Sequence, residues 1–168
     1  MSTLAPIDYW VKRLGLINIG IGYITETHRS PITVFPKGQS QEEEGRSSCS
    51  SIYFLQERGQ HGKLHSLQSD ELYFYHKGAP QIVLYFDDNV ESKLVRKVLG
   101  PYEDQHLQIC VPAGKIMVQF VEETAKQEYY LGSIVVSPGF DPRDSTPANR
   151  NELIKKYPQH KDFIIKYT

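Results

Sequence analysis

Between residues 15 and 136 the sequence is a succession of short apolar runs. Each run is five to seven residues long and rich in Tyr, Phe, Val and Ile, as in residues 51–55, 81–86 and 116–121. Gly, Pro, Asn and Asp separate the runs, which is typical of β-strands joined by turns. No helical pattern lies between them. The chain of 168 residues is therefore predicted to be a single all-β domain, either a sandwich or a barrel.

Helical periodicity is confined to the two ends of the chain. Apolar side chains at positions 7, 10, 11 and 14 precede Gly15, which predicts a short helix over residues 6–14. Near the other end, Thr146 as N-cap and Pro147 in the first turn predict a helix that ends close to Tyr157.

A polar segment interrupts the strand region at about residues 36–48. It is predicted to be a mobile surface loop of the one domain, which spans residues 1–168. A longer run over residues 19–28 is predicted to form a single strand before it.

A histidine and a glutamate stand close together in the middle of the chain. Glu71 follows His65 by six residues, Gly78 follows Glu71 by seven, and the residues VPAG occupy 111–114. Gly78 and Gly114 are expected in turns with positive φ. Because side chains alternate along a strand, Glu71, Tyr73 and Tyr75 are expected to share one face.

These signatures resemble the two motifs of the cupin superfamily. Further segments narrow the resemblance to its DUF985 (cupin-5) family: GYITETHRSP at 22–31, SSIYFL at 50–55, SDELY at 69–73, VSPGFD at 136–141 and RNEL at 150–153. The resemblance implies a double-stranded β-helix, or jelly-roll barrel, with short helices at both ends. It also implies a site inside the barrel and a homodimer.

In a cupin barrel the strand faces that carry His65, Glu71, Tyr73 and Tyr75 point inward. On the strand of the second motif, Met117 and Gln119 would do the same. The resemblance thus predicts a cavity with one imidazole, one carboxyl group, two phenols, one amide and apolar packing. Arg29 is the one arginine near these motifs that is a candidate for holding a phosphate group.

The sequence departs from the family pattern at several of these positions. Leu67 and Met117 stand where a metal-binding cupin supplies histidine, and Ser66 stands where the family has arginine. A zinc or iron site needs about three protein ligands, and His65 with Glu71 gives two. His106 or Gln119 would have to complete the set, so the expectation is a site with no metal and no cofactor.

Three functions fit this predicted cavity. The favoured one is binding, without a reaction, of a polar, aromatic or sugar-nucleotide-like molecule stacked on aromatic rings and oriented by His65, Glu71 and Gln119. The alternative is a metal-independent isomerase or epimerase in which His65 is the base and Tyr73 or Tyr75 the acid. In the third, the protein is a structural dimer and His65 only neutralises Glu71.

Composition excludes several other classes of partner. The 19 basic and 20 acidic side chains give a net charge of −1 with no basic stripe, so no nucleic-acid partner is expected. No apolar run approaches the roughly 18 residues of a membrane span, and the N-terminus lacks a secretory signal, so a cytoplasmic protein is expected. Cys49 and Cys110 form no CxxC pair. Cys110, within an apolar strand, is expected to be buried.

Overall fold

The structure is a computed structural model that describes residues 5–35 and 44–168. Most of its strands lie in two sheets. The strands of the larger sheet are β1 (Ile17–Asn18), β2 (Tyr23–Arg29), β5 (Ser50–Glu57), β7 (Asp70–Gly78), β10 (Gln108–Val111) and β12 (Tyr129–Ser137). Those of the smaller sheet are β6 (His65–Leu67), β8 (Gln81–Phe86), β9 (Leu94–Leu99), β11 (Ile116–Phe120) and β13 (Ser145–Pro147).

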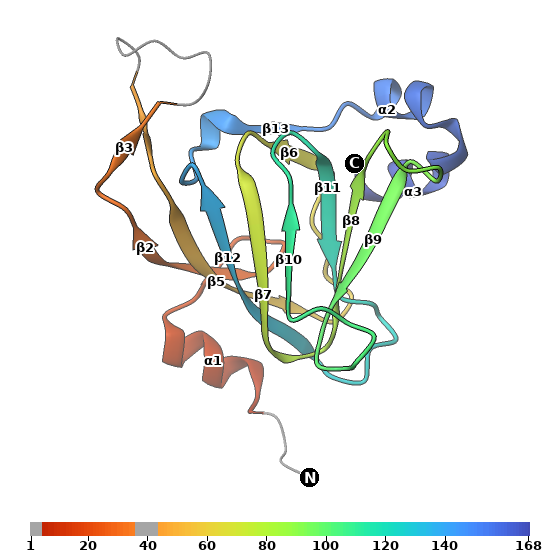
Figure 1. Ribbon diagram of the computed structural model, residues 1–168. Helices are drawn as coiled ribbons and strands as arrows, with labels where there is room; N and C mark the ends of the chain where they lie inside the picture. Colours follow the sequence, from red (N-terminus) through yellow and green to blue (C-terminus); the bar gives the residue numbers. More distant parts are fainter. Residues whose placement is uncertain (1–4, 36–43) are drawn as a thin grey trace.

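The two sheets form an antiparallel barrel, as the sequence predicted (Figure 1). The larger sheet has the order β1-β2-β5-β12-β7-β10 and the smaller one β13-β6-β11-β8-β9. Between them lies a core of side chains from both sheets, with Phe54, Tyr73 and Tyr130 from the larger and Val83 and Met117 from the smaller. Strand alternation explains this core, because these side chains all lie on the inward face of their strands.

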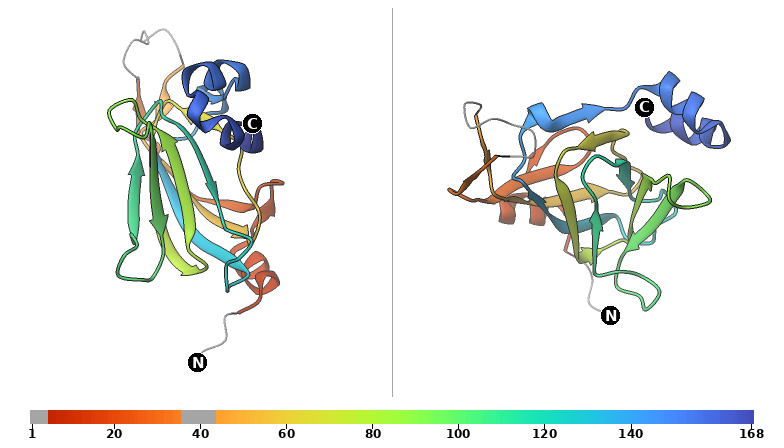
Figure 2. Two further views of the ribbon diagram at one scale, coloured as in Figure 1. Left: turned by 90° about the vertical axis from the view of Figure 1, so that its right-hand side faces the viewer. Right: turned by 45° about the horizontal axis from the view of Figure 1, so that its top comes forward.

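Three helices lie outside the barrel: α1 (Ile7–Leu14), α2 (Arg150–Lys156) and α3 (Lys161–Tyr167). Figure 2 shows α2 and α3 together at one side of the molecule, away from α1. They cover the outer face of the smaller sheet, where Leu153 and Ile164 pack against Leu84 and Phe86. This second core explains why all six residues of β8 are buried: both faces of the strand are covered.

The N-terminal helix covers part of the larger sheet. Its apolar side packs beside Leu55 and Leu131, which point out of the barrel. The indole N–H of Trp10 donates a hydrogen bond to the Tyr129 hydroxyl, 2.6 Å away. The helix ends at Gly15, whose left-handed backbone terminates it as the sequence predicted.

Only the edge of the predicted loop at residues 36–48 lies among the described residues. Residues 36–43 lie outside the described residues, but β3 (Thr33–Val34) pairs with β4 (Arg46–Ser47) on either side of them. Arg46 is only 6% exposed. Its Nε and Nη2 donate to the two carboxylate oxygens of Asp144, at 2.7 and 2.9 Å. A bidentate pair of this kind fixes the orientation of the Arg46 side chain, and the mobility of the loop stays a prediction.

Two further expectations about strands are corrected. The strand predicted over residues 19–28 starts only at Tyr23, as β2, because a turn through Gly20 and Gly22 with positive φ separates it from β1 at residues 17–18. Cys110 is exposed, not buried. In β10 the alternation places Ile109 and Val111 inside the barrel, so Cys110 between them points outward.

The C-terminal helix begins later than predicted. Thr146 and Pro147 belong to β13, an edge strand that pairs with β6, where proline's missing N–H breaks no ladder. Asn149 is the actual N-cap of α2, since its side-chain oxygen accepts the N–H groups of Asn151 and Glu152 at 3.0 and 3.2 Å. The helix ends before Pro158, as expected, and α3 follows it.

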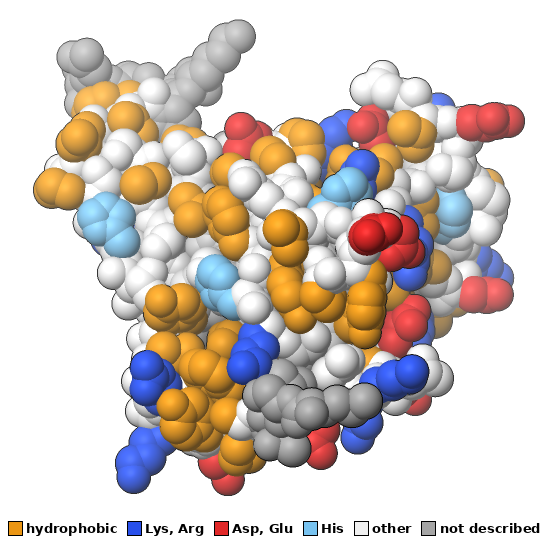
Figure 3. All heavy atoms as spheres, turned by 60° about the horizontal axis from the view of Figure 1, so that its bottom comes forward, with side chains coloured by type: hydrophobic (Ala, Val, Ile, Leu, Met, Phe, Trp, Pro, Cys, Tyr) orange, Lys and Arg blue, Asp and Glu red, His pale blue; other side chains and the backbone are white. Residues whose placement is uncertain are grey.

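Charged side chains of both signs are interspersed on the end of the molecule that carries α1 (Figure 3). Hydrophobic side chains lie between them. Because positive and negative side chains are mixed, this face carries no electrostatic field of a single sign. None of the helices in the described ranges has the length and the apolar composition that a bilayer-spanning helix requires.

The glycine at the end of β7 supplies a stability test. Gly78 has φ of +93°, and a Cβ there would lie 2.0 Å from the Tyr129 carbonyl oxygen. Gly114 has φ of +75° but open space around it. We expect Gly114→Ala to lower the free energy of unfolding by about 1–2 kcal/mol, the cost of a left-handed alanine. Gly78→Ala should lower it by clearly more, because backbone must move. Urea unfolding of both variants measures the difference, and equal losses would contradict the close contact.

Candidate functional site

A cavity of about 330 Å³ opens between the two sheets. It lies at the end of the barrel where β7 begins and β12 ends, since Glu71 pairs with Val136 there. The side chains around it are mainly apolar. The lining residues are Ile19, Ile21, Ile24, Glu26, Ser50, Ile52, Phe54, His65, Leu67, Glu71, Tyr73, Gln119, Ile134, Val136, Phe140 and Ser145.

The structure brings four of the predicted site residues to this cavity. Glu71 and Tyr73 come from β7 of the larger sheet, and His65 and Gln119 come from β6 and β11 of the smaller sheet. The polar groups therefore approach the same space from opposite walls of the barrel. This arrangement follows from the register, because His65 pairs with Met117, two residues before Gln119.

Glu71 and Tyr73 form a polar pair in the wall of the cavity. Glu71 is 6% and Tyr73 1% exposed. The Tyr73 hydroxyl donates to Oε2 of Glu71 at 2.9 Å. Burial raises the pKa of the Glu71 carboxyl above its ordinary value, while the charge of His65 and the tyrosine's hydrogen bond oppose the shift. Burial, and next the charge of Glu71, raise the Tyr73 pKa well above its usual range.

His65 has a defined tautomer in its neutral form. Its Nδ1 lies 2.8 Å from the carbonyl oxygen of Lys63. A carbonyl only accepts hydrogen bonds, so Nδ1 carries the proton and Nε2 is left as an acceptor. Although His65 and Glu71 line the same cavity, no hydrogen bond or ion pair joins these two described residues. The alternative in which His65 serves only as a direct partner of Glu71 therefore has no contact to support it.

Gln119 adds an amide group to the cavity lining. The residue is 5% exposed, and its Oε1 is buried with no donor from the described residues. The amide lies over Gly62, and its Oε1 is 3.2 Å from the position that a Cβ on Gly62 would occupy. Behind it a second buried amide, that of Gln56, accepts a hydrogen bond from Gln81 and donates one to the carbonyl of Ile21. Through these two hydrogen bonds, Gln56 links Ile21, in the turn between β1 and β2, to Gln81 in β8.

Three other predicted site residues lie outside the cavity lining. Tyr75 points into the barrel core, but its hydroxyl donates to the Gly78 carbonyl at 2.8 Å, toward the opposite end. Met117 is fully buried behind Tyr73, with 3.8 Å between its sulfur and the hydroxyl. Arg29 stands at the rim, where Glu26 and the carbonyl of Phe140 occupy its guanidinium. It is not placed to hold a phosphate inside the barrel.

Most of the apolar residues that line the cavity were not predicted from the sequence. Ile24, Ile52 and Ile134 all come from the inward faces of the larger sheet, and strand alternation would have identified them. Ile19 and Ile21 were not identifiable in this way. They reach the cavity because the turn folds back over the barrel. At Gly22 the turn lies so close to β5 that a Cβ on this residue would be 2.7 Å from the Leu55 carbonyl oxygen.

The side chains present do not compose a metal centre. His65 and Glu71 are two ligands, and Leu67, which also lines the cavity, cannot ligate. His106 is exposed in a loop after β9 and is not among the lining residues. Across residues 5–35 and 44–168, no group of three His, Cys, Asp or Glu side chains comes together in a way that would hold a metal ion.

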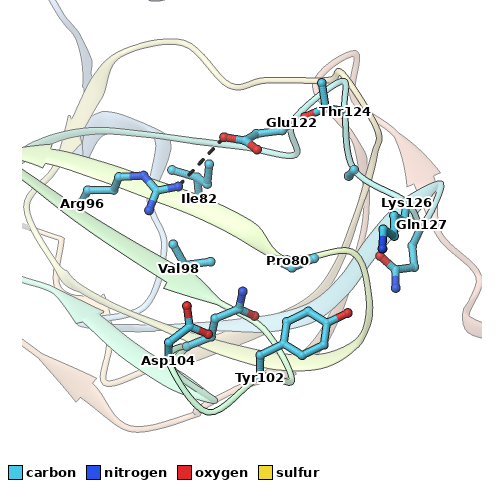
Figure 4. A pocket seen from close by; sticks show the side chains of 12 residues that line it. Pro80, Ile82, Arg96, Val98, Tyr102, Asp104, Glu122, Thr124, Lys126 and Gln127 are labelled. Atoms are coloured by element: carbon cyan, nitrogen blue, oxygen red, sulfur yellow. Dashed lines mark ion pairs between the residues drawn. The ribbon is translucent and has the colours of Figure 1, made fainter.

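A second concavity lies at the opposite end of the barrel, where Pro80 follows β7 (Figure 4). Ile82 and Val98 contribute its apolar side chains, and charged side chains surround them. An ion pair of 4.0 Å joins Arg96 and Glu122 there, and both side chains are more than half exposed. This cleft contains no buried ionisable side chain, so the barrel cavity is the better candidate for a functional site.

Comparisons with known proteins agree on the fold. The family profile described as Cupin superfamily (DUF985) matches residues 8–148. A hypothetical protein from Leishmania major superposes with a TM-score of 0.83 at 30% identity, over 98% of this chain and 99% of its own. A protein from Shewanella oneidensis gives 0.80 at 27% identity, with 98% of each chain covered.

More distant structures share the fold alone. The capsular polysaccharide assembling protein CapF from Staphylococcus aureus has a TM-score of 0.56 at 12% identity, over 80% of this chain and 34% of its own. Oxalate decarboxylase from Bacillus subtilis gives 0.51 at 16%, over 88% and 35%. No curated protein matches the chain.

The raised pKa of Glu71 makes stability depend on pH. This carboxyl contributes stability that is complete below its ordinary value of 4.5 and is lost as pH rises through the raised folded-state value. Glu71→Gln keeps an oxygen for the Tyr73 hydroxyl but cannot ionise. Relative to wild type, the variant should therefore gain stability from pH 4 to pH 8, by about 1.4 kcal/mol per unit of pKa shift.

Denaturant unfolding at a series of pH values measures this change. Glu103→Gln, at an exposed position, is the matched control and should follow the wild type throughout. If Glu71→Gln also runs parallel to wild type across the range, the carboxyl does not lie in the desolvated position described above.

Proposed function

The chain belongs to the DUF985 family of the cupin superfamily, and from that premise we propose that its barrel binds a small, largely apolar molecule with a polar head. The open-ended cavity of about 330 Å³ carries this proposal. Ligand pockets of about 300–1,000 Å³ with apolar walls and a few convergent polar groups are the usual form of small-molecule sites.

The wall favours a compact aromatic or branched aliphatic body. Isoleucine side chains from β2, β5 and β12 line one side of the cavity, and Phe54 and Phe140 add aromatic rings. Apolar contact of this kind stabilises a complex by about 25 cal/mol for each Å² of apolar surface removed from water. Rings also prefer edge-to-face or offset contact with other rings, which supports an aromatic ligand in particular.

Polar selection would come from the inner end of the cavity. There Glu71, Tyr73, His65 and Gln119 present a carboxyl group, a hydroxyl, an imidazole nitrogen and an amide. Glu71, Tyr73 and Gln119 are buried and His65 is half-buried, so a ligand that leaves these groups unpaired loses affinity, whereas one that bonds to them is selected. A binding protein in which these four residues orient the head is therefore the function that the geometry supports best.

The isomerase alternative draws less support from the same residues. His65 and Tyr73 line the cavity, but the Tyr73 hydroxyl already donates to Glu71, and the Tyr75 hydroxyl is committed to Gly78. A sugar nucleotide also carries a diphosphate, for which Arg or Lys donors are the usual partners. Among the described residues none of either type lines the cavity. A homodimer stays a prediction from the family resemblance.

A cavity-filling substitution tests binding directly. Ile24 lines the cavity, whereas the next residue, Thr25, points to the outer face of β2. Ile24→Trp should fill the space and weaken binding of a neutral aromatic probe, indole, at least tenfold. Thr25→Trp, which adds the same ring outside the barrel, should leave indole binding unchanged.

Isothermal titration or ligand-observed NMR with indole measures both variants. Circular dichroism confirms that each variant is folded before binding is compared. Equal affinity of indole for the two tryptophan variants, or no indole binding to the wild-type protein, would place the site elsewhere.

A further inference from the structure

The cavity contains more negative than positive charge. Its lining includes the carboxyl groups of Glu26 and Glu71, and no Lys or Arg side chain from the described residues contributes to it. Glu26 lies at the rim and is paired with Arg29, whose Nη2 is 2.6 Å from its Oε2. Among the described residues, no Lys or Arg makes such a contact with Glu71. The inner end of the cavity therefore holds one carboxyl group that the protein does not neutralise by direct contact.

This carboxyl group receives one hydrogen bond, and that bond comes from a neutral group. The Tyr73 hydroxyl donates to Oε2, and no hydrogen bond to Oε1 comes from the described residues. Burial raises the pKa of this carboxyl group, because a buried carboxylate without a contacting cation is costly, and the charge of His65 opposes the shift only in part. A positive charge supplied by the ligand would remove that cost. An anion would increase it.

His65 presents an acceptor to the same space. Its Nδ1–H is used by the Lys63 carbonyl, so the free nitrogen of the neutral ring is a lone pair. The Gln119 amide does not select between donors and acceptors, because it can turn either its oxygen or its nitrogen to a ligand. The two groups that do select, Glu71 and neutral His65, both require a donor.

We propose that the ligand of this cavity is an amine: a protonated ammonium head bound by Glu71 and His65, on the aromatic or branched apolar body that the isoleucine and phenylalanine wall accepts. An ammonium group has three N–H donors and no acceptor. It therefore satisfies the free carboxylate oxygen and the imidazole lone pair at once. This inference rests on the proposed function and narrows it to one ligand class.

Three probes with one body test the ligand class. Tryptamine, tryptophol and indole-3-propionate share an indole ring and a two-carbon arm, and they end in an ammonium, a hydroxyl and a carboxylate group. Isothermal titration at pH 7.5 with the wild-type protein is expected to rank them in that order. A charge-assisted hydrogen bond should favour tryptamine over tryptophol about tenfold, and the propionate should bind at least tenfold more weakly than tryptophol.

The variant Glu71→Gln identifies the group responsible. It should remove the preference for tryptamine over tryptophol, while tryptophol itself binds within a few-fold of its wild-type affinity. Glu122→Gln, which removes an exposed carboxylate in the cleft at the other end of the barrel, should retain the tenfold preference.

A pH series on the wild-type protein tests the ammonium preference without a variant. Because a carboxylate and an imidazole both lose an acceptor on protonation, tryptamine should lose affinity relative to tryptophol as pH falls. If tryptophol binds as tightly as tryptamine at pH 7.5, or the propionate binds best, the amine assignment is overturned while the binding function stands. If none of the three indoles binds, the proposed function itself fails.

Discussion

The hydrogen bond between Tyr73 and Glu71 is the interaction on which the site depends. It is buried between two sheets whose facing side chains are otherwise mainly apolar. A carboxyl group in such surroundings needs a donor, and the tyrosine two residues along the same strand face supplies one. The tyrosine ring at the same time packs into the core beside Met117. The Tyr73 ring thus packs in the barrel core, while its hydroxyl orients the Glu71 carboxyl group at the cavity.

The helices outside the barrel allow this interior to remain partly unfilled. A small sheet with one solvated face would rely on the barrel core for its stability. Here α2 and α3 bury the outer face of the smaller sheet, and α1 buries part of the outer face of the larger one. The described residues therefore form three separate apolar clusters, and burial of apolar surface stabilises the fold in each of them. A cavity at one end of the central cluster is tolerated because the other two do not depend on it.

Much of the barrel was predictable because local rules govern it. Alternation within β7 placed Glu71 and Tyr73 on one face, which the family resemblance predicted to point inward, and the turn at Gly78 was expected from its glycine. The same rules were wrong where pairing with distant residues decides the outcome. Pro147 looks like the start of a helix, yet it lies in an edge strand beside His65. Cys110 is apolar and lies in a strand, but the register of β10 against β7 turns it to solvent.

The sequence by itself determined the class of fold and, through the family resemblance, the inward positions of His65, Glu71, Tyr73 and Gln119, because strand period and motif spacing are properties of neighbouring residues. Only the tertiary structure decided which of these groups share one space. The ordered pairing of both sheets sends Tyr75 toward the far end of the barrel, and ion pairing holds Arg29 at the rim. The turn at Gly20 and Gly22 brings Ile19 and Ile21 over the opening. Distances between strands far apart in the chain fix these outcomes, and no local pattern encodes them.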